Sequence, residues 1–167
     1  MKFINQKIGV FFWKLIVAFP INFQNVLANI LFSFLKNPDL KRNIFSRKNI
    51  DAAFPNLNKQ EKINLFNKNL KSMIRGIFDT GRAWFWNDSK INSLIKYEIF
   101  GLNKLIATKG NLLIFKHSHH LELDSRILGM HCELYGVERA HNSPFMQKVQ
   151  SMGRLKGLNA LADKNSP

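Results

Sequence analysis

The segment that decides the fold covers residues 109–126 and reads KGNLLIFKHSHHLELDSR. The apolar run 111–115 follows the turn residue Gly110, and this pattern predicts a short buried strand. Leu121 and Leu128, with polar residues between them, then predict a helix. Histidines and carboxylates therefore fall where a strand ends and a helix begins, which is the edge where open α/β folds bind their ligands.

Two histidine–carboxylate pairs in this segment share one spacing. His117 lies five residues before Glu122 and His119 five before Asp124, whereas His120 has no carboxylate at that distance and is excluded. Five residues of a continuous helix turn about 500°, so the paired side chains would point roughly 140° apart. They meet only if the histidine lies in the turn before the helix. A histidine placed there takes a proton from a hydroxyl near neutral pH, and the carboxylate fixes its tautomer.

Six short motifs accompany these pairs along the chain. They are NIDAAFP at 49–55, FDTGRAWFW at 78–86, RILG at 126–129, GVER at 136–139, NSP at 142–144 and GRLK at 153–156. Together they resemble the bacterial lipid A late acyltransferases, which transfer lauroyl or myristoyl groups. These enzymes belong to the wider lysophospholipid acyltransferase superfamily. The resemblance covers nearly the whole chain, and it is far more specific than a histidine–carboxylate pair by itself.

The resemblance implies a catalytic pair and a reaction. Matching Arg126–Gly129 to the family places its histidine on His117 and its carboxylate on Glu122, which leaves His119 with Asp124 as the alternative register. His117 would take the proton of a hydroxyl on a Kdo-bearing lipid A precursor, and the oxygen would attack the thioester of an acyl-carrier protein. The implied reaction needs no cofactor and no metal.

Three basic residues near the end of the chain form the implied substrate-binding set. The resemblance places Arg139, Arg154 and Lys156 on a phosphate of the carrier's pantetheine arm or of the glycolipid. From the residues alone, Arg154 is equally explained as a favourable cation at a helix C-terminus. Arg126 stands four residues after Glu122, so we expect it to pair with that carboxylate or with another group on the helix surface.

The chain also departs from the family pattern. Family members usually have Tyr-Arg-Pro followed by Asn where this chain has Glu138-Arg139-Ala140-His141, and usually Arg where Lys156 stands. They also continue for about as long again after the position of Pro167. We therefore expect residues 37–167 to be the N-terminal part of the acyltransferase domain, with activity impaired by truncation.

Charge points to an anionic partner. The chain has a formal charge of +14 and an isoelectric point near 10.2, and a strongly basic surface attracts lipid headgroups, phosphorylated glycolipids, an acidic carrier protein or nucleic acid. The resemblance does not favour nucleic acid, and a biased genome composition is the alternative source of the lysines. The single cysteine, Cys132, cannot form an internal disulfide, which fits a reducing, cytosol-facing location.

Residues 1–36 are the candidate membrane anchor. No residue from Leu15 to Leu35 is charged, and this length suffices for a bilayer core of roughly 30 Å. Pro20 and several amides interrupt the stretch, so two amphipathic helices lying in the interface are favoured over one spanning helix. Packing of these helices on the domain core is the alternative. We expect a protein of the bacterial inner membrane whose catalytic part faces the cytoplasm.

The remaining patterns complete an expected α/β fold: membrane-associated helices, then the first half of a mixed sheet with helices, as in the glycerolipid acyltransferases. The histidines and carboxylates of 117–124 lack a closed ligand set, so we expect no metal site. The aromatic cluster 83–86 suits either the core or a wall beside the acyl chain. Further expected elements are a capped helix from Asn58, a strand at 94–100, a helix at 102–107, a strand at 135–137, and a helix that starts at Pro144 behind a cap at Asn142 or Ser143.

Two alternative functions remain open at this point. A glycerolipid acyltransferase would use the same histidine–carboxylate pair, and the block 78–86 argues against it. A non-catalytic basic module would bind membranes or nucleic acid, and salt-dependent DNA binding as tight as binding to anionic vesicles would favour it.

Overall fold

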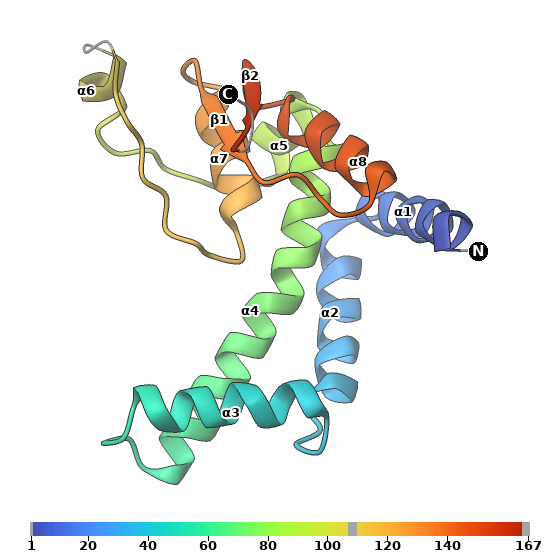
Figure 1. Ribbon diagram of the computed structural model, residues 1–167, viewed down its shortest axis with the longest axis vertical. Coiled ribbons are helices and arrows are strands. Elements are labelled where there is room, and N and C mark those ends of the chain that lie inside the picture. Colours follow the sequence, from blue (N-terminus) through green and yellow to red (C-terminus); the bar gives the residue numbers. More distant parts are fainter. Residues whose placement is uncertain (1, 107–109, 165–167) are drawn as a thin grey trace. The chain divides into compact units, whose positions relative to one another are not determined.

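A computed structural model describes residues 2–106 and 110–164 of the chain. Over these residues the fold is mostly helical and includes one two-stranded parallel sheet (Figure 1). The expected α/β class is thus confirmed only in its coarsest form, since the observed sheet is small. Along the chain, the elements are α1 (Lys2–Ala18), α2 (Ile21–Leu35), α3 (Lys41–Ala53), α4 (Lys59–Phe85), α5 (Asp88–Leu94), α6 (Leu102–Ile106), α7 (Leu121–Gly129), β1 (Tyr135–Glu138), α8 (Pro144–Arg154) and β2 (Ala160–Asp163).

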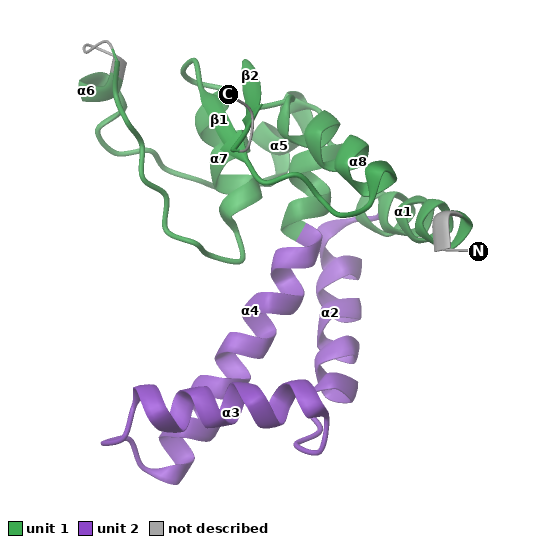
Figure 2. Ribbon diagram, in the orientation of Figure 1, with its two compact units in different colours: residues 1–18, 79–167 green, residues 19–78 purple. Residues whose placement is uncertain are grey.

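The chain forms two compact units, shown in different colours in Figure 2. Unit 1 comprises residues 1–18 and 79–167, and unit 2 comprises residues 19–78. Helix α4 contributes its first part to unit 2 and its last two turns to unit 1. The candidate catalytic residues all belong to unit 1.

Unit 2 is built on α2, α3 and the first part of α4. The predicted cap of α4 is confirmed: the Asn58 N–H donates to Glu61 (2.8 Å), and the Glu61 N–H donates to the Asn58 side chain (3.0 Å). The buried stripe follows every fourth residue and therefore rotates about 40° per step, which leaves Ile77 half exposed. The buried members of that stripe are Phe66, Leu70, Ile74 and Phe78.

The sheet in unit 1 is a parallel β–α–β arrangement. Strand β1 pairs with β2 in the register Tyr135 with Ala160 to Glu138 with Asp163, and α8 connects the two strands. The predicted strand at 135–137 and the helix at Pro144 are confirmed, with Ser143 as the cap that accepts from the Met146 N–H. The sequence did not predict β2, which has four residues and follows a short turn.

Two predicted strands are wrong. Residues 111–115 form no strand but lie in an extended exposed segment, where Leu112 is 88% and Ile114 90% exposed. Within the described residues no strand pairs with this segment, so its apolar side chains have no sheet to pack on. Residues 95–100 are likewise irregular, and Leu94 ends α5. The short helix expected at 102–107 is α6, and Ala107 lies outside the described residues.

The N-terminal apolar stretch forms two helices, as predicted, with Pro20 between them. Neither is a membrane-spanning helix: over 2–106 and 110–164, each helix is either too short or too polar to cross a bilayer. The aromatic cluster at the end of α4 is largely buried, with Ala83, Trp84 and Trp86 inside the unit, and Trp84 and Trp86 also line a cavity. The Trp86 indole donates to the Val17 carbonyl (2.7 Å), and this bond holds the end of α4 against α1.

Candidate functional site

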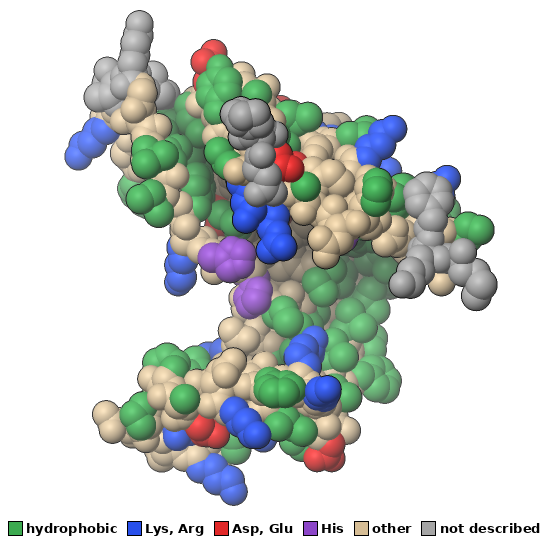
Figure 3. Space-filling model, in the orientation of Figure 1, with side chains coloured by type: hydrophobic (Ala, Val, Ile, Leu, Met, Phe, Trp, Pro, Cys, Tyr) green, Lys and Arg blue, Asp and Glu red, His purple; other side chains and the backbone are tan. Residues whose placement is uncertain are grey.

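The candidate histidines lie where the extended segment enters α7. His120 is the residue that precedes the first turn of α7, and its backbone carbonyl accepts from the Leu123 and Asp124 N–H groups (2.9 and 3.0 Å). His117 and His119 are exposed in the segment before it. Figure 3 shows histidine side chains at the surface of this part of the molecule. The predicted turn before the helix is therefore present, and it is accessible from solvent.

Glu122 has partners other than a histidine. Its carboxylate accepts from the Trp84 indole (2.9 Å) and from the Arg154 guanidinium, whose Nε lies 3.0 and 3.1 Å from the two oxygens and whose Nη2 also donates. The hydrogen bonds made within 2–106 and 110–164 include none between His117 and Glu122. The same residues show none between His119 and Asp124.

Arg154 joins Glu122 to a second carboxylate. Its Nη1 donates to Glu138 at 2.7 Å, so one guanidinium ties α7, β1 and α8 together. Glu138 is buried and also accepts from Gln147, Gln150 and Ser151. We call Glu122, Glu138 and Arg154 the Arg154 network.

The network shifts the ionisation of its members. Burial alone would raise the pKa of Glu138, but the hydrogen bonds from Arg154, Ser151, Gln150 and Gln147 outweigh it and hold that pKa below its ordinary value. Burial alone would lower the pKa of Arg154, but the bonds and charges of Glu122 and Glu138 raise it. The network therefore favours the ionised form of both Glu138 and Arg154.

A second network contains a histidine that the sequence had excluded. His120 Nδ1 lies 2.5 Å from the Asp79 carboxylate, and Asp79 also accepts from Arg82 Nη1 at 2.7 Å. Asp79 and Arg82 are buried. Burial lowers the pKa of Arg82 against the opposing effect of Asp79. The imidazole–carboxylate contact that the structure does form is thus the one between His120 and Asp79.

Asp124, from the alternative register, lies close enough to His120 and Asp79 for their charges to shift its pKa. Burial raises its pKa, the charge of His120 lowers it, and the charge of Asp79 raises it again. Its side chain remains exposed. In the described part of the chain, no group of histidine, cysteine and carboxylate side chains has an arrangement that holds a metal ion.

The basic residues at the end of the site differ in their surroundings. Arg139 is exposed, whereas Arg154 belongs to the network above. Arg126 is buried and bonds to Asp88 and to the Lys156 carbonyl (2.6 Å), so of its two expected pairings the one with Glu122 is wrong. The side chain of Lys156 donates to the Trp86 carbonyl (3.2 Å), and burial together with the charge of Arg126 lowers its pKa.

A cavity of about 520 Å³ opens beside this end of the site. Trp84 forms part of its wall and donates to Glu122 on another side, so the cavity adjoins the Arg154 network. The wall combines apolar and basic side chains, which suits a ligand that has an apolar arm and an anionic group. It includes Lys14, Val17, Trp86, Val149, Met152 and Lys156.

Sequence reasoning missed the partners that come from far along the chain. Asp79 meets His120 across 41 residues, and Glu138 meets Arg154 across 16. One signal for Asp79 was present: it is a carboxylate directly after Phe78 on a helix whose neighbouring positions are buried, and buried carboxylates are almost always paired. Glu138 gave no comparable signal, because a strand end tolerates a charged residue.

Comparison with known proteins identifies the family of the chain. A family model described as bacterial lipid A biosynthesis acyltransferase matches residues 2–166. The chain belongs to this family. The resemblance inferred from the six motifs is thereby confirmed.

Named relatives agree with the family. The chain is 32% identical over 163 residues to the lipid A biosynthesis acyltransferase of Haemophilus influenzae, covering 94% of this chain and 51% of that protein. It is 29% identical to the lipid A biosynthesis palmitoleoyltransferase of Escherichia coli, covering 79% and 44%. It is 28% identical to the lauroyltransferase of the same organism, covering 94% and 51%.

The chain thus spans about half the length of the curated relatives it matches. No solved structure matches it.

Proposed function

We propose that the protein takes part in lipid A biosynthesis by transferring a fatty acyl group from an acyl-carrier protein to a hydroxyl of a Kdo-bearing lipid A precursor. The observation that carries the proposal is the family match over residues 2–166. The names of the three relatives support acyl transfer as the reaction class.

In the proposed mechanism His117 is the general base. It takes the proton of the acceptor hydroxyl as the oxygen attacks the thioester carbonyl, and the resulting tetrahedral intermediate releases the carrier thiolate, which takes up the proton from His117. Ester formation and thioester cleavage balance without a redox cofactor or a metal. The exposure of His117 supports this role, since a base must reach its substrate.

Glu122 is the proposed partner of His117. A carboxylate offers about four lone-pair positions, so it can accept from an imidazole while it keeps bonds to Trp84 and Arg154. Arg154 then holds the carboxylate in place, and Glu122 orients the imidazole once the segment before α7 closes toward it.

His120 is the second candidate for the base. Its Nδ1 already contacts Asp79, a carboxylate buried beside Arg82, and this is the arrangement that fixes a tautomer and stabilises an imidazolium. The match to RILG at 126–129 favours His117, whereas the contact with Asp79 favours His120. Variants at the two positions separate them.

We also propose that α1 and α2 attach the protein to the cytoplasmic face of the inner membrane. Both helices expose large apolar side chains, and lysines lie at their ends. Anionic lipid attracts each such lysine by about 1 kcal/mol near the surface. The exposed apolar residues include Ile8, Phe11, Phe12 and Leu15 on α1 and Phe23, Val26, Ile30 and Phe34 on α2.

Arg139, Lys156 and the cavity complete the proposed substrate site. Lys156 and Lys14 line the cavity together with apolar side chains, which supports binding of an acyl chain with an adjacent phosphate. Arg154 bonds to two carboxylates, so a role on phosphate requires it to exchange one of them. An acidic acyl-carrier protein fits the formal charge of +14.

An acyl-transfer assay tests the proposal. The full chain in lipid–detergent micelles receives a labelled acyl-carrier protein and the lipid A precursor, and ester formation is followed by mass spectrometry. His117→Ala is expected to lower the rate by roughly 10²–10⁴-fold, the usual contribution of a general base, whereas His119→Ala leaves most of the activity. Loss in His120→Ala with activity retained in His117→Ala would assign the base to His120, and transfer that neither substitution lowers would contradict the proposed mechanism.

Membrane attachment has its own test. Phe11→Ser with Phe34→Ser is expected to weaken sedimentation with anionic vesicles at high salt, because two exposed apolar groups leave the interface. Phe100→Ser, at a residue that is 88% exposed outside these helices, is the matched control and should bind as the unmodified chain does. Equal losses in the two proteins would show that α1 and α2 are not the attachment surface.

A further inference from the structure

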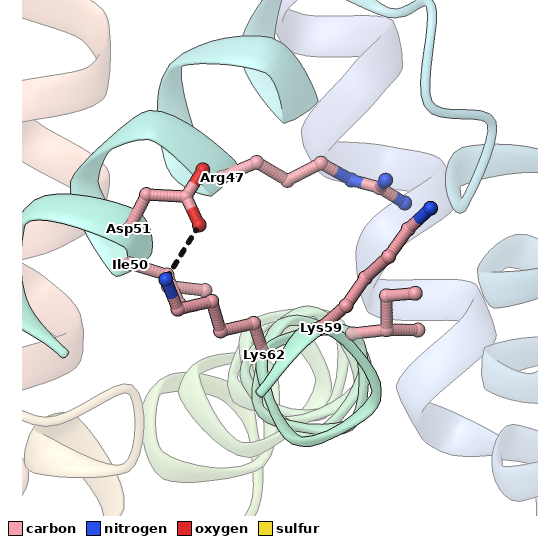
Figure 4. A pocket seen from close by; sticks show the side chains of 6 residues that line it. Arg47, Ile50, Asp51, Lys59 and Lys62 are labelled. Carbon is pink, nitrogen blue, oxygen red and sulfur yellow. Dashed lines mark ion pairs between the residues drawn. The ribbon is translucent and has the colours of Figure 1, made fainter. Parts of the chain in front are cut away.

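A pocket of about 320 Å³ lies in unit 2 and shares no residue with the proposed acyl-transfer site. It is formed by α3 and the first turns of α4 (Figure 4). Its walls carry three basic side chains, one carboxylate and two isoleucines: Arg47, Lys59, Lys62, Asp51, Ile50 and Ile63. The formal charge of the lining is therefore +2.

The carboxylate compensates only one of the three cations. Asp51 pairs with Lys62 at 3.3 Å, and this is the contact drawn in Figure 4. Arg47 and Lys59 have no carboxylate partner among residues 2–106 and 110–164. Figure 4 shows their charged ends turned toward one another. Two cations that converge without an anion repel each other, and this arrangement is stabilised when an anion lies between them.

Arg47 is held in this position by packing. Its guanidinium lies over the Phe66 ring at 4.7 Å from the centroid, and Phe66 is part of the buried stripe of α4. Its Nε is buried and has no hydrogen-bond partner within the described chain. The charged guanidinium is therefore partly desolvated, and an anion bound at its terminal nitrogens would offset this cost. The cation is thus preorganised, with its terminal nitrogens directed into the pocket.

We propose that this pocket binds a phosphate monoester. A dianion matches the formal charge of +2, and the planar guanidinium of Arg47 matches two phosphate oxygens bidentately while Lys59 supplies a second cation. The volume is about ten times the share of one water in the liquid, which is about 30 Å³. It therefore accommodates the phosphate together with the first atoms of the group that carries it. Ile50 and Ile63 provide an apolar wall for those atoms.

A phosphate monoester has two possible sources, an amphiphile in the membrane interface and a soluble metabolite or phosphate ion. Figure 3 shows basic and hydrophobic side chains side by side over α3. Ile44 is exposed and stands seven residues before Asp51, hence on the same face of α3 as the pocket. The recognised chemistry is the same for both sources, and the experiment distinguishes them.

The test measures binding by the full chain and does not depend on acyl transfer. Isothermal titration with inorganic phosphate probes the soluble source. Co-sedimentation with phosphatidylcholine vesicles that contain phosphatidic acid probes the interfacial source. Vesicles with phosphatidylglycerol at the same surface potential carry phosphodiesters and report non-specific attraction.

Of four variants, two should weaken binding, one should strengthen it and one is the control. Arg47→Met should weaken binding about tenfold or more, and Lys59→Gln about threefold or more, because each removes a cation that contacts the anion. Asp51→Asn should strengthen binding about threefold, since it releases Lys62 toward the ligand. Lys68→Gln removes an exposed cation of α4 outside the pocket and should change nothing. Circular dichroism confirms that each variant is folded, and Lys59→Gln and Asp51→Asn keep the test valid if Arg47→Met unfolds.

Each outcome decides the proposal. Sensitivity to these variants with phosphate, with phosphatidic acid or with both supports the pocket and identifies the source. Absence of binding to both probes overturns it. Binding of both probes that the pocket variants leave unchanged also overturns it, and equal binding to phosphatidylglycerol vesicles excludes the interfacial source. Loss of acyl transfer in His117→Ala with phosphate binding intact would show that the two sites are separate.

Discussion

The segment 111–119 leads into α7, which carries Glu122 of the Arg154 network, but the segment and the network differ in how firmly they are held. Glu122 is fixed by Trp84 and Arg154, and Arg154 is fixed in turn by Glu138. The segment that carries His117 is extended, exposed and without a neighbouring strand in the described residues. The two members of the proposed catalytic pair, His117 and Glu122, therefore differ in how many contacts hold their side chains. Glu122 is positioned by the fold, whereas His117 lies in an exposed, irregular segment.

The same comparison explains why His120 and Asp79 form the contact that is present. His120 lies at the start of α7, which is anchored, whereas His117 lies three residues earlier in the exposed segment. Because α7 is anchored, the His120 side chain is held within hydrogen-bond distance of the buried Asp79 carboxylate. This difference yields four predictions about stability, in order of decreasing effect.

The largest effect is expected from Arg154→Met. The substitution keeps the length of the side chain but leaves Glu122 and Glu138 without their cation, and removal of one partner from a buried ion pair usually costs about 3–5 kcal/mol. The free energy of unfolding, measured by urea titration, should fall by that amount at pH 7.

Arg139→Met is the matched control for this loss. Arg139 is exposed, so its replacement should change the unfolding free energy by about 0.5 kcal/mol or less. If the two variants were equally stable, Arg154 would not hold the anchored side of the site together.

The next effect concerns the close approach of α7 to the turn after α8. A Cβ at Gly129 would lie 1.7 Å from the Gly157 carbonyl oxygen and 2.6 Å from its carbon. Backbone must move to admit it, so Gly129→Ala should cost about 1–3 kcal/mol or more.

Gly9→Ala is the matched control, because a side chain at Gly9 meets no neighbouring atom. No atom lies within 4 Å of a Cβ at Gly9, and this residue is inside α1. Replacement there should be neutral or stabilise the helix by up to about 1 kcal/mol. The melting temperature should therefore fall in Gly129→Ala and stay the same or rise in Gly9→Ala, and parallel decreases would contradict the packing described here.

Much of the fold was predictable from local signals in the sequence. The cap of α4, the break at Pro20, the cap at Ser143 and strand β1 were all predictable, because each depends on residues within a few positions of one another. The family was predictable as well, because its six motifs are short continuous stretches of sequence.

The errors came from long-range partners. The apolar run 111–115 has the composition of a buried strand, but a strand is stable only when another one pairs with it. Asp79 with His120, and Arg126 with Asp88, join residues about 40 positions apart, and spacing rules that look five residues ahead cannot find them. The His117–Glu122 assignment therefore stays a prediction.

A smaller effect is expected from pH. The folded state holds the pKa of Glu138 below its ordinary value of 4.5, so its stabilising contribution is complete above pH 4.5 and is lost as pH falls through the lower, folded value. Asp124 has the opposite sign: its pKa is raised in the fold, so protonation on acidification returns some stability. Urea midpoints measured from pH 6 down to pH 3 should fall less in Glu138→Gln than in the unmodified chain. They should fall more in Asp124→Asn.

The smallest effect should come from the exposed segment itself. Ile114 is 90% exposed, so Ile114→Ser removes almost no packing and should change the unfolding free energy by about 0.5 kcal/mol or less. Leu123 on α7 is buried, and Leu123→Ala should cost about 2–5 kcal/mol. Urea titration of both variants measures the contrast directly. If the unfolding free energy fell as much in Ile114→Ser as in Leu123→Ala, residues 111–115 would have to be packed. The exposed segment and the Arg154 network would then no longer differ in how firmly they are held.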